Sequence, residues 1–461
     1  MVNLEYDEIL DKAKKLHFIG IGGSGMCPLA EILHNEGKEI SGSDVDNESD
    51  TVKRIRSYGI KVAIGQRAEN ITDAEMVVYT AAIQKDNPEL LEAKRRGIPT
   101  IERSILLGAL CRRYNNTIAV SGTHGKTTTT SMITTVLVEA GIDPSIIIGG
   151  KLPLINGNGR AGNSNYMVCE ACEFVDTFLQ ITPACAVILN VDADHLEYFG
   201  TIDGVIASFK KFAAQTRDLI IANGDDANTM KAVAEASAKV VTFGFNDTND
   251  YYAANLKMDE GSEWEFDVMK NGQFLYHAAL SVPGHHNVLN ALAATAACEY
   301  AGAKPEDIAL GLRSFHGACR RYEIHTQHNG ITIADDYAHH PAEIEAILTA
   351  CKEMSFKNVW AVFQPFTYSR TKMHMDYFAR VLAIADKVVL TPIMAAREID
   401  DLGVNSEQLA AKIPGSVLLP TFEDVAKYVT GNVQEDDLVI TMGCGDIYKC
   451  AKIMTKIINE R

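Results

Sequence analysis

The most constraining feature of this sequence is a glycine-containing loop that joins an apolar run to a helical one. The apolar run TIAVS ends at Ser121, and a helical stretch follows the loop up to Gly141. The loop itself consists of Gly122, Thr123, His124, Gly125, Lys126, Thr127 and Thr128. A strand that turns into a helix at glycines and a lysine is the context of a phosphate-binding loop, because backbone amides and the helix N-terminus face phosphate oxygens there. The sequence therefore predicts an α/β fold that binds the phosphates of a nucleotide at this loop.

The side chains of the loop indicate ATP with Mg²⁺. Lys126 can reach the β and γ phosphates, and the hydroxyl of Thr127 can hold the metal. Compared with the general pattern G-x-x-x-x-G-K-[ST], Val120 stands at the first glycine and Gly122 lies two places later. The alternative is an ordinary glycine turn before a threonine-rich helix, and the flanking strand and helix disfavour it. We expect a shortened phosphate loop.

Chain length and the alternation of strand-like and helical runs predict three α/β domains. At 461 residues the chain is too long for one core, because domains average about 150 residues. Alternating strands and helices imply parallel sheets with right-handed crossovers. The runs YYAANLKM and EWEFDVM alternate in polarity, which predicts a small antiparallel part. We expect an N-terminal Rossmann-like domain over 1–108, a central P-loop ATPase-type domain over 109–318 and a C-terminal Rossmann-like domain over 319–461.

The composition bears on partners and compartment. The net charge of −17 argues against nucleic acid, because phosphate backbones are bound by clustered Lys and Arg. The start MVNLEYDEIL lacks the pattern of a signal peptide, and no stretch approaches the roughly 18 consecutive apolar residues of a membrane helix. The ten cysteines are scattered through apolar runs, which indicates reduced thiols. We expect a cytoplasmic monomer or weak homodimer without a membrane or nucleic-acid partner.

A second glycine-rich turn follows the first strand-like run of the chain. The segment GIGGSG fits the pattern G-x-G-x-x-G, and an acidic residue follows the next strand, near the position that binds a ribose hydroxyl. The pattern predicts a nucleotide or dinucleotide, so a dehydrogenase is one interpretation. Because the chain has a separate ATP loop, a nucleotide-bearing substrate fits better. The candidate substrate-binding residues are Gly22, Gly23, Ser24, Gly25, Met26, Ser43 and Asp44.

Carboxylates and a histidine follow two strand-like runs of the central part. Glu170 and Glu173 lie in CEACEF, and His195 ends the segment NVDADH. Mg²⁺ prefers oxygen ligands and keeps several waters, so one carboxylate, the hydroxyl of Thr127 and phosphate oxygens would complete a site. Glu173 and His195 are the candidates, and ordinary surface residues are the alternative.

Amide and guanidinium side chains come later in the sequence. Asn287 and Asn290 lie one turn apart at the start of an alanine-rich helix, where their amides suit an adenine edge. Taken alone, the position of Asn287 favours the alternative that it caps the helix N-terminus. Arg320 and Arg321 lie near the predicted start of the third domain, where an arginine can reach a phosphoryl group. Two charges on a solvated loop are the alternative for this pair.

The order of the motifs resembles that of the Mur ligases along nearly the whole chain. The motifs are GIGGSGM, GTHGKTTT, EACE, DADH, HHNVLNALAA, RRYE, DDYAHHP, SRT, AARE and TMGCGD. GTHGKTT is typical of the whole superfamily, whereas GIGGSGM with DDYAHHP resembles the alanine-adding branch. The resemblance implies ATP-dependent ligation of L-alanine to the carboxylate of UDP-N-acetylmuramate through an acyl phosphate, in peptidoglycan precursor synthesis. The alternatives are a tripeptide ligase of murein recycling that uses the same sugar nucleotide and, from another class, an NAD-dependent dehydrogenase.

The resemblance also implies roles for residues at matching positions. The implied catalytic residues are Lys126, Glu173, His195, His339 and Arg370. The implied ATP-binding residues beyond the loop are Asn287, Asn290, Arg321 and Tyr337. The implied Mg²⁺ ligands are Thr127 and Glu173 for one ion and His195 for a second. His339 and Arg370 are expected to face the substrate carboxylates.

The sequence departs from the commonest family pattern at several positions. Phe366 stands where many members have His, and Thr367 replaces a frequent Arg. Gln66 replaces a frequent His, and Phe174-Val175 follow EACE in place of Ser-Asp. These departures bear most on the contacts of the C-terminal domain around residue 366.

Overall fold

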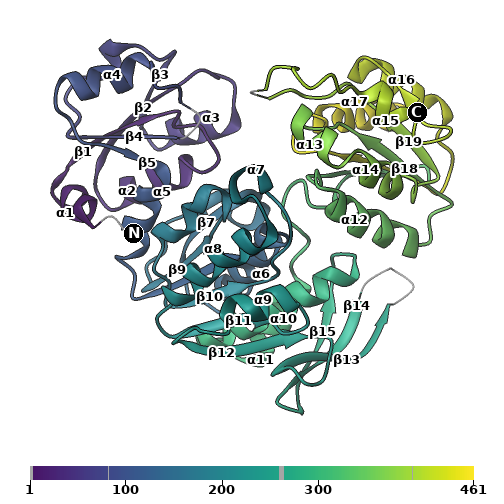
Figure 1. Cartoon of the computed structure of the whole chain (residues 1–461), viewed down its shortest axis with the longest axis horizontal. Coiled ribbons are helices and arrows are strands. Elements are labelled where there is room, and N and C mark those ends of the chain that lie inside the picture. Colours follow the sequence, from purple (N-terminus) through teal and green to yellow (C-terminus); the bar gives the residue numbers. More distant parts are fainter. Residues whose placement is uncertain (1–3, 81–82, 259–263, 397) are drawn as a thin grey trace. The chain divides into compact units, whose positions relative to one another are not determined.

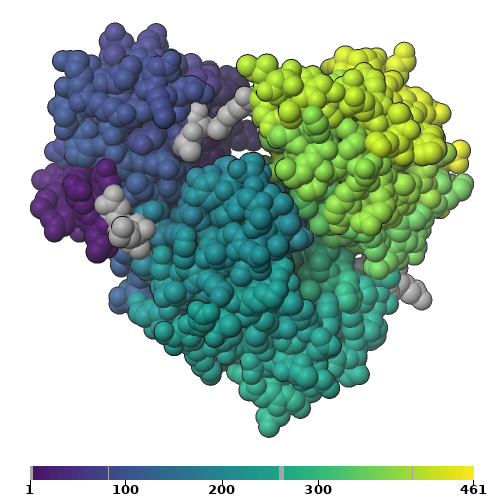
Figure 2. Space-filling model, viewed as in Figure 1, coloured from purple at the N-terminus to yellow at the C-terminus, as the bar shows by residue number. Residues whose placement is uncertain are grey.

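The computed structural model describes residues 4–80, 83–258, 264–396 and 398–461. Among these residues the strands form sheets of five, ten and six strands, with helices between them along the chain (Figure 1). Contacts divide the chain into two compact units. The first comprises Met1–Asn255, Phe266–Ala278 and Leu289–Phe315, and the second comprises Leu256–Glu265, Ala279–Val288 and His316–Arg461. Figure 2 shows the surface of the chain in the same view, coloured by residue number.

The N-terminal sheet is entirely parallel, and its strand order β3-β2-β1-β4-β5 is that of a Rossmann-type sheet without the sixth strand. Its strands are β1 (Lys15–Ile19), β2 (Glu39–Asp44), β3 (Lys61–Ile64), β4 (Met76–Tyr79) and β5 (Thr100–Glu102). Its helices are α1 (Glu5–Lys12), α2 (Cys27–Asn35), α3 (Asp50–Ser57), α4 (Pro88–Arg95) and α5 (Arg103–Cys111), with the 3₁₀ turn η1 (Ala68–Asn70). The carboxyl end of β1 leads into the glycine turn, which places that turn where nucleotides bind in such sheets.

The central sheet has the order β15-β14-β13-β12-β11-β10-β6-β9-β7-β8. Its strands are β6 (Asn116–Ser121), β7 (Ser145–Leu152), β8 (Gly157–Arg160), β9 (Tyr166–Glu170), β10 (Cys185–Ile188), β11 (Leu219–Asn223), β12 (Lys239–Gly244), β13 (Tyr251–Met258), β14 (Trp264–Lys270) and β15 (Gln273–Leu280). Strands β6, β7 and β9 to β13 pair in parallel, whereas β8 runs antiparallel to β7. The antiparallel part of the sheet therefore includes a hairpin that the sequence did not predict.

Helices and 3₁₀ turns connect the strands of the central sheet. They are α6 (Lys126–Glu139), η2 (Pro153–Ile155), η3 (Phe174–Gln180), α7 (Leu196–Phe199), α8 (Ile202–Ala214), α9 (Ala227–Val233), α10 (His285–Tyr300) and α11 (Pro305–Arg313). Strand β6 lies in the middle of the sheet and its residues from Thr117 onward are buried. An apolar strand buried on both faces, followed at once by α6, fixes the phosphate-loop motif at the carboxyl edge of the sheet.

The C-terminal sheet has the order β16-β17-β21-β18-β19-β20 and is parallel except for β16. Its strands are β16 (Glu323–His328), β17 (Ile331–Asp336), β18 (Asn358–Phe363), β19 (Lys387–Leu390), β20 (Val417–Leu418) and β21 (Asp437–Met442). Its helices are α12 (Pro341–Glu353), α13 (Tyr368–Met373), α14 (Met375–Leu382), α15 (Ser406–Ala410), α16 (Phe422–Asn432) and α17 (Tyr448–Asn459).

The predicted fold class is confirmed, because three mostly parallel α/β sheets follow one another along the chain. The boundaries at residues 108 and 318 stay predictions, and the first of them falls inside α5. No helix in the described part of the chain is long and apolar enough to cross a bilayer. In the AARE motif, Arg397 lies outside the described residues.

Candidate active site

The loop at residues 122–128 is held in place by the segment that follows the neighbouring strand β10. The Thr123 amide donates to the carbonyl of Asn190 at 3.1 Å, and the His124 amide donates to the Asn190 side chain at 2.8 Å. The Asp192 amide donates to the hydroxyl of Thr123 at 2.9 Å. A loop fixed by this many contacts is preorganised, so its amides need little rearrangement to bind an anion.

Glycine is required at two positions of this loop. Gly122 and Gly125 have φ values of +138° and +87°, which L side chains rarely adopt. A Cβ atom on Gly122 would lie 2.9 Å from the Cβ of Leu189, and one on Gly125 would lie 2.7 Å from Oδ1 of Asn290. Gly122 lies two places later than the first glycine of the general pattern. It is therefore the residue at which the chain leaves β6, close to Leu189.

The first turn of α6 offers backbone amides to a ligand. Helix α6 begins at Lys126, and the first N–H groups of a helix have no intrahelical acceptor. Within the described residues, the amides of Lys126, Thr127 and Thr128 donate to no other group. Together with the positive end of the helix dipole, these amides form a site suited to phosphate oxygens.

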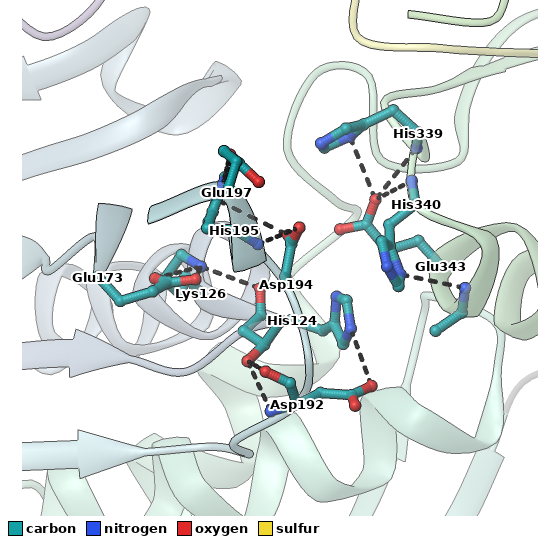
Figure 3. A network of polar contacts seen from close by, with 12 residues as sticks. His124, Lys126, Glu173, Asp192, Asp194, His195, Glu197, His339, His340 and Glu343 are labelled. Carbon is teal, nitrogen blue, oxygen red and sulfur yellow. Dashed lines mark hydrogen bonds and ion pairs between the residues drawn. The ribbon is translucent and has the colours of Figure 1, made fainter. Parts of the chain in front are cut away.

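The ammonium group of Lys126 lies at the centre of the loop and pairs with Glu173 (Figure 3). Its Nζ lies 3.0 Å from Oε2 of Glu173, and it donates to the carbonyls of Gly122 and Thr123 at 2.5 and 3.0 Å. Burial alone would lower the pKa of Lys126, but Glu173, Cys172 and Glu170 together outweigh burial and raise that pKa above its ordinary value. Lys126 is thus a fixed positive charge beside the amides of the loop.

The hydroxyl of Thr127 contacts Glu170, the other carboxylate of the CEACEF segment. Thr127 Oγ1 donates to Oε2 of Glu170 at 2.9 Å, and the amide of Gly149 donates to the same oxygen at 2.9 Å. The structure thus brings Thr127 and Glu170 together, whereas the predicted ligand Glu173 lies on Lys126. Sequence reasoning named Glu170 but did not select it, although its place at the end of β9 is the same signal that favoured Glu173.

His195 lies beside two carboxylates and an aromatic ring. Its Nδ1 is 3.4 Å from Glu197 and its Nε2 is 3.7 Å from Asp194, and its ring centroid is 4.6 Å from that of Phe174 (Figure 3). The residue has φ +54°, a left-handed conformation that turns the chain into α7. Phe174, one of the departures from the family pattern, therefore packs on the candidate metal ligand. No cluster of three or more His, Cys, Asp or Glu that could hold a metal occurs among the described residues.

Asn287 and Asn290 are both buried in α10. The helix begins at His285, so Asn287 is its third residue, and the alternative that Asn287 caps the helix is wrong. The side-chain amide of Asn287 instead donates to the carbonyl of Pro283 at 2.6 Å. Asn290 lies against Gly125 of the phosphate loop, because a Cβ atom on that glycine would be only 2.7 Å from Oδ1 of Asn290.

The N-terminal glycine turn is tied to the end of β2. The amide of Gly22 donates to Oδ2 of Asp44 at 2.8 Å, and the amides of Gly20 and Ile21 donate to the carbonyl of Ser43. The side chain of Ser43 is fully buried and donates to Glu89 at 2.6 Å. Asp44 and Ser43 therefore shape the turn in this structure. Gly23, Ser24, Gly25 and Met26 line a cavity beside it.

Arg320 and Arg321 both lie over the ring of Tyr337, at 4.9 and 5.3 Å from its centroid. Arg320 also donates from Nε to Asp335 at 2.8 Å and from Nη1 to the carbonyl of Gly445 at 3.0 Å. The alternative of two charges on a solvated loop is therefore wrong for Arg320. The arrangement joins the RRYE, DDYAHHP and TMGCGD motifs in one place.

His339 and His340 surround the carboxylate of Glu343 at the start of α12 (Figure 3). Nδ1 of His339 lies 3.2 Å from Oε2 of Glu343, and the His340 amide donates to the same oxygen at 3.2 Å. His340 and Glu343 form a capping box for the helix. This local role accounts for part of the DDYAHHP motif.

Arg370 lies near the TMGCGD loop. Burial raises the pKa of the Cys444 thiol to about 12, and the positive charge of Arg370 opposes that rise. Thr367, which replaces a frequent Arg, has φ +65° and caps α13 through the Arg370 amide. The backbone of Phe366 forms an isolated parallel β-bridge with that of Met394. Both departures from the family pattern therefore have a local structural role.

Three family models match consecutive parts of the chain. They are the Mur ligase family catalytic domain at residues 15–115, the Mur ligase middle domain at 120–298 and the Mur ligase glutamate ligase domain at 320–445. A UDP-N-acetylmuramate–L-alanine ligase of Acetivibrio thermocellus is 44% identical over 462 aligned positions, which cover 98% of each chain.

Two solved structures resemble this chain over nearly all of its length. The UDP-N-acetylmuramate-alanine ligase MurC of Thermotoga maritima has a TM-score of 0.82 and 30% identity, covering 97% of this chain and 99% of its own. A murein peptide ligase of Psychrobacter arcticus has a TM-score of 0.72 and 23% identity with the same coverage, which supports the shared fold alone. Given the full-length match at 44% identity and the phosphate loop with its ion-paired lysine, this chain belongs to the Mur ligase family.

Proposed function

We propose that this protein ligates L-alanine to the carboxylate of UDP-N-acetylmuramate and converts ATP to ADP and phosphate. The observation that carries the proposal is the preorganised phosphate loop with its ion-paired, partly buried Lys126, in a chain that matches alanine-adding relatives from end to end. The Mur ligase relatives at 43–44% identity are named UDP-N-acetylmuramate–L-alanine ligase. These names favour neither the tripeptide ligase nor the dehydrogenase.

The reaction joins two molecules in two steps. An oxygen of the muramate carboxylate attacks the γ-phosphorus of ATP, which forms an acyl phosphate and releases ADP. The amine of alanine then attacks the acyl carbon, and the tetrahedral intermediate expels phosphate and leaves an amide. Lys126 and the first-turn amides of α6 stabilise the charge that grows on the phosphate oxygens in the first step.

Mg²⁺ is the metal that we propose for this site, and the residues present fit it. The hydroxyl of Thr127 lies 2.9 Å from a carboxylate oxygen, which is the oxygen chemistry that Mg²⁺ prefers. Mg²⁺ commonly has few protein ligands, because waters and substrate phosphates complete its shell. Thr127 and Glu173 would hold one ion and His195 a second, with Glu170 orienting the threonine hydroxyl. When bound, the metal neutralises charge on the β and γ phosphates.

The remaining residue roles are part of the same proposal. We assign the adenine region to Asn287 and Asn290, the base to Tyr337 and the phosphates to Arg321. We assign the substrate carboxylates to His339 and Arg370. Because the reaction uses ATP and a UDP-sugar, we also infer a cytoplasmic location.

Phosphate release by the purified protein tests the function. We expect release that requires ATP, Mg²⁺, UDP-N-acetylmuramate and L-alanine together, with EDTA as the test of the metal. A parallel assay with the tripeptide L-alanyl-γ-D-glutamyl-meso-diaminopimelate should give little product. Release that ignores either substrate would exclude ligation, and preference for the tripeptide would assign the protein to the recycling reaction.

A further inference from the structure

The segment 174–176, which directly follows Glu173, has an unusual backbone conformation. Val175 and Asp176 have φ values of +53° and +58°, both in the left-handed region. A β-branched residue rarely adopts this conformation, because its side chain crowds its own backbone. Strain of this kind persists only where the surrounding contacts hold the segment in place. The side chains of Phe174 and Asp176 make those contacts.

Both ends of this segment contact the turn that carries His195. Phe174 packs on the imidazole of His195, with the ring centroids 4.6 Å apart and the ring planes tilted by 50°. The carboxylate of Asp176 accepts from the hydroxyl of Tyr198 at 3.0 Å and from the hydroxyl of Ser208. The left-handed backbone thus allows both side chains to reach the same turn, one at His195 and the other three residues later.

The polar contacts of His195 do not by themselves fix its ring (Figure 3). Its Nδ1 lies 3.4 Å from Glu197, whose side chain is 61% exposed, and its Nε2 lies 3.7 Å from Asp194. Both distances exceed those of a well-formed hydrogen bond, and exposed ion pairs hold a side chain only weakly. An aromatic contact restricts the plane of a ring as well as its position. Phe174 therefore supplies the contact that sets the plane of the imidazole.

Phe174 and Val175 are not explained by packing of the core. They are 42% and 46% exposed, and they stand where the commonest family pattern has Ser-Asp. Single exposed apolar residues are ordinary on protein surfaces. Here, however, the exposure coincides with backbone strain, and strain is concentrated at functional sites. The contact of Phe174 with His195 is therefore the reason that we infer for an apolar residue at this position.

We propose that Phe174 is a positioning residue that orients the imidazole of His195 for the metal ion of the ligation reaction. The inference rests on the proposed function, because that function assigns a metal ion to His195. Phe174 acts through His195 and not on the reacting atoms, since its ring limits the rotation of the imidazole. A ligand that is oriented in advance needs less rearrangement when the ion binds.

NMR of the histidine-labelled protein without metal tests the orientation of the ring. An aromatic ring at 4.6 Å shifts the resonances of the His195 ring protons, and the loss of these resonances in His195→Asn assigns them. We expect the shift to disappear in Phe174→Ser and in Phe174→Leu, which keeps the apolar volume without the ring. It should remain in Phe174→Tyr. His195 resonances that are the same in all of the Phe174 variants as in the wild type would overturn the proposal.

Steady-state kinetics test the consequence for the reaction. For Phe174→Ser we expect the Mg²⁺ concentration at half-maximal activity to rise about tenfold, the lower end of the effect of groups that orient metal ligands. KM for UDP-N-acetylmuramate should not change, and Phe174→Tyr should restore the wild-type dependence on Mg²⁺. A lost NMR shift with an unchanged Mg²⁺ dependence would show that Phe174 packs on His195 without positioning it, and this outcome would also overturn the proposal.

Controls separate this inference from the function and from misfolding. Phe274→Ser removes a phenylalanine of β15 that is 60% exposed, and it should match the wild type in every measurement. Phe174→Ser should bind a non-hydrolysable ATP analogue in EDTA with wild-type affinity, which shows that the phosphate loop is folded. Wild-type protein that does not ligate would refute the proposed function and this role with it. Wild-type ligation with an unaffected Phe174→Ser variant would refute only the role of Phe174.

Discussion

At the scale of single residues, Lys126 is the side chain on which the proposed chemistry depends most. Its ammonium group is oriented by two loop carbonyls and by Glu173. A positively charged side chain at another position would therefore not take its place beside the phosphates. For Lys126→Ala we expect ligation to fall by about a thousandfold or more, the scale of a lost phosphoryl-stabilising cation. Phosphate release measures this effect. UDP-N-acetylmuramate should still bind with wild-type affinity, and near-normal ligation would show that the loop assignment is wrong.

Asp336 gives a residue-scale prediction about pH. Its carboxylate is buried and accepts from the amides of Tyr322 and Ala338, and burial raises its pKa from 3.8 to about 6 against the opposing charge of Arg321. A folded-state pKa above the unfolded value means that the unfolded chain ionises first. The stability associated with the protonated group is therefore present below pH 3.8 and is lost as pH rises through 6.

The Asp336→Asn variant isolates this contribution, because asparagine does not titrate. Between pH 5 and pH 7.5 we expect the wild type to lose about 1 kcal/mol of unfolding free energy relative to the variant. Denaturant unfolding at both pH values measures the difference, and any constant loss from the altered hydrogen bonds cancels. A difference that does not change with pH would contradict the raised pKa.

The sequence predicted individual site residues only where a motif set both residue type and spacing. The loop at residues 122–128 was recognisable because its strand, glycines and lysine stand at fixed positions. Glu170 was not selected over Glu173, because both follow the same strand and only the folded chain brings Thr127 and Gly149 onto Glu170. The alternative of a solvated loop for Arg320 was wrong for the same reason, since Asp335 and Gly445 approach it only in the folded chain.

At the scale of elements, the β7–β8 hairpin connects the glycine turn to the central sheet. The side chain of Asn158 is buried and donates to the carbonyl of Ser24, and Arg54 of α3 donates to the carbonyl of Gly159 at 3.0 Å. A Cβ atom on Gly159 would lie 2.4 Å from Pro28 at the start of α2. The hairpin therefore packs against the glycine turn and the start of α2.

Removal of the Asn158 side chain should loosen the glycine turn without touching the ATP loop. For Asn158→Ala we expect KM for UDP-N-acetylmuramate to rise about fivefold to tenfold, the scale of one buried hydrogen bond, with KM for ATP unchanged. Asn163→Ala is the matched control, because Asn163 is exposed on the following loop and contacts Asp143. Steady-state kinetics distinguish the outcomes. Equal rises in both KM values would indicate a general structural defect.

Elements were predictable from sequence where they are buried on both faces. The apolar runs of β6, β10 and β21 were recognised from their composition alone. Strand β8 has the sequence GNGR, which contains no apolar residue, so its pairing with β7 could not be inferred from periodicity. Strands β13 and β14, which lie inside the edge strand β15, were predicted because polar and apolar residues alternate in YYAANLKM and EWEFDVM.

At the scale of the whole molecule, the chain divides into two compact units, although the sequence predicts three domains. One buried cluster contains Phe18 of the N-terminal sheet together with Leu106, Met167 and Phe209, so the first two predicted domains share apolar contacts. Sequence periodicity identifies each sheet but does not show which sheets share a core, because that depends on contacts between distant segments. The C-terminal sheet has buried clusters of its own, which include Phe363.

This arrangement predicts how ligands affect unfolding. A ligand that binds only the native form of a unit stabilises it by about 2.7 kcal/mol at a hundredfold excess over Kd. Because the glycine turn and the phosphate loop lie in the same unit, UDP-N-acetylmuramate and an ATP analogue should raise the same calorimetric transition. A second transition, from the unit that contains β16 to β21, should not move with UDP, because UDP lacks the muramate carboxylate that we assign to His339 and Arg370. Lys126→Ala should remove the shift by the ATP analogue and keep the shift by the sugar nucleotide. Separate transitions for the first two predicted domains would show that their shared cluster does not make them unfold together.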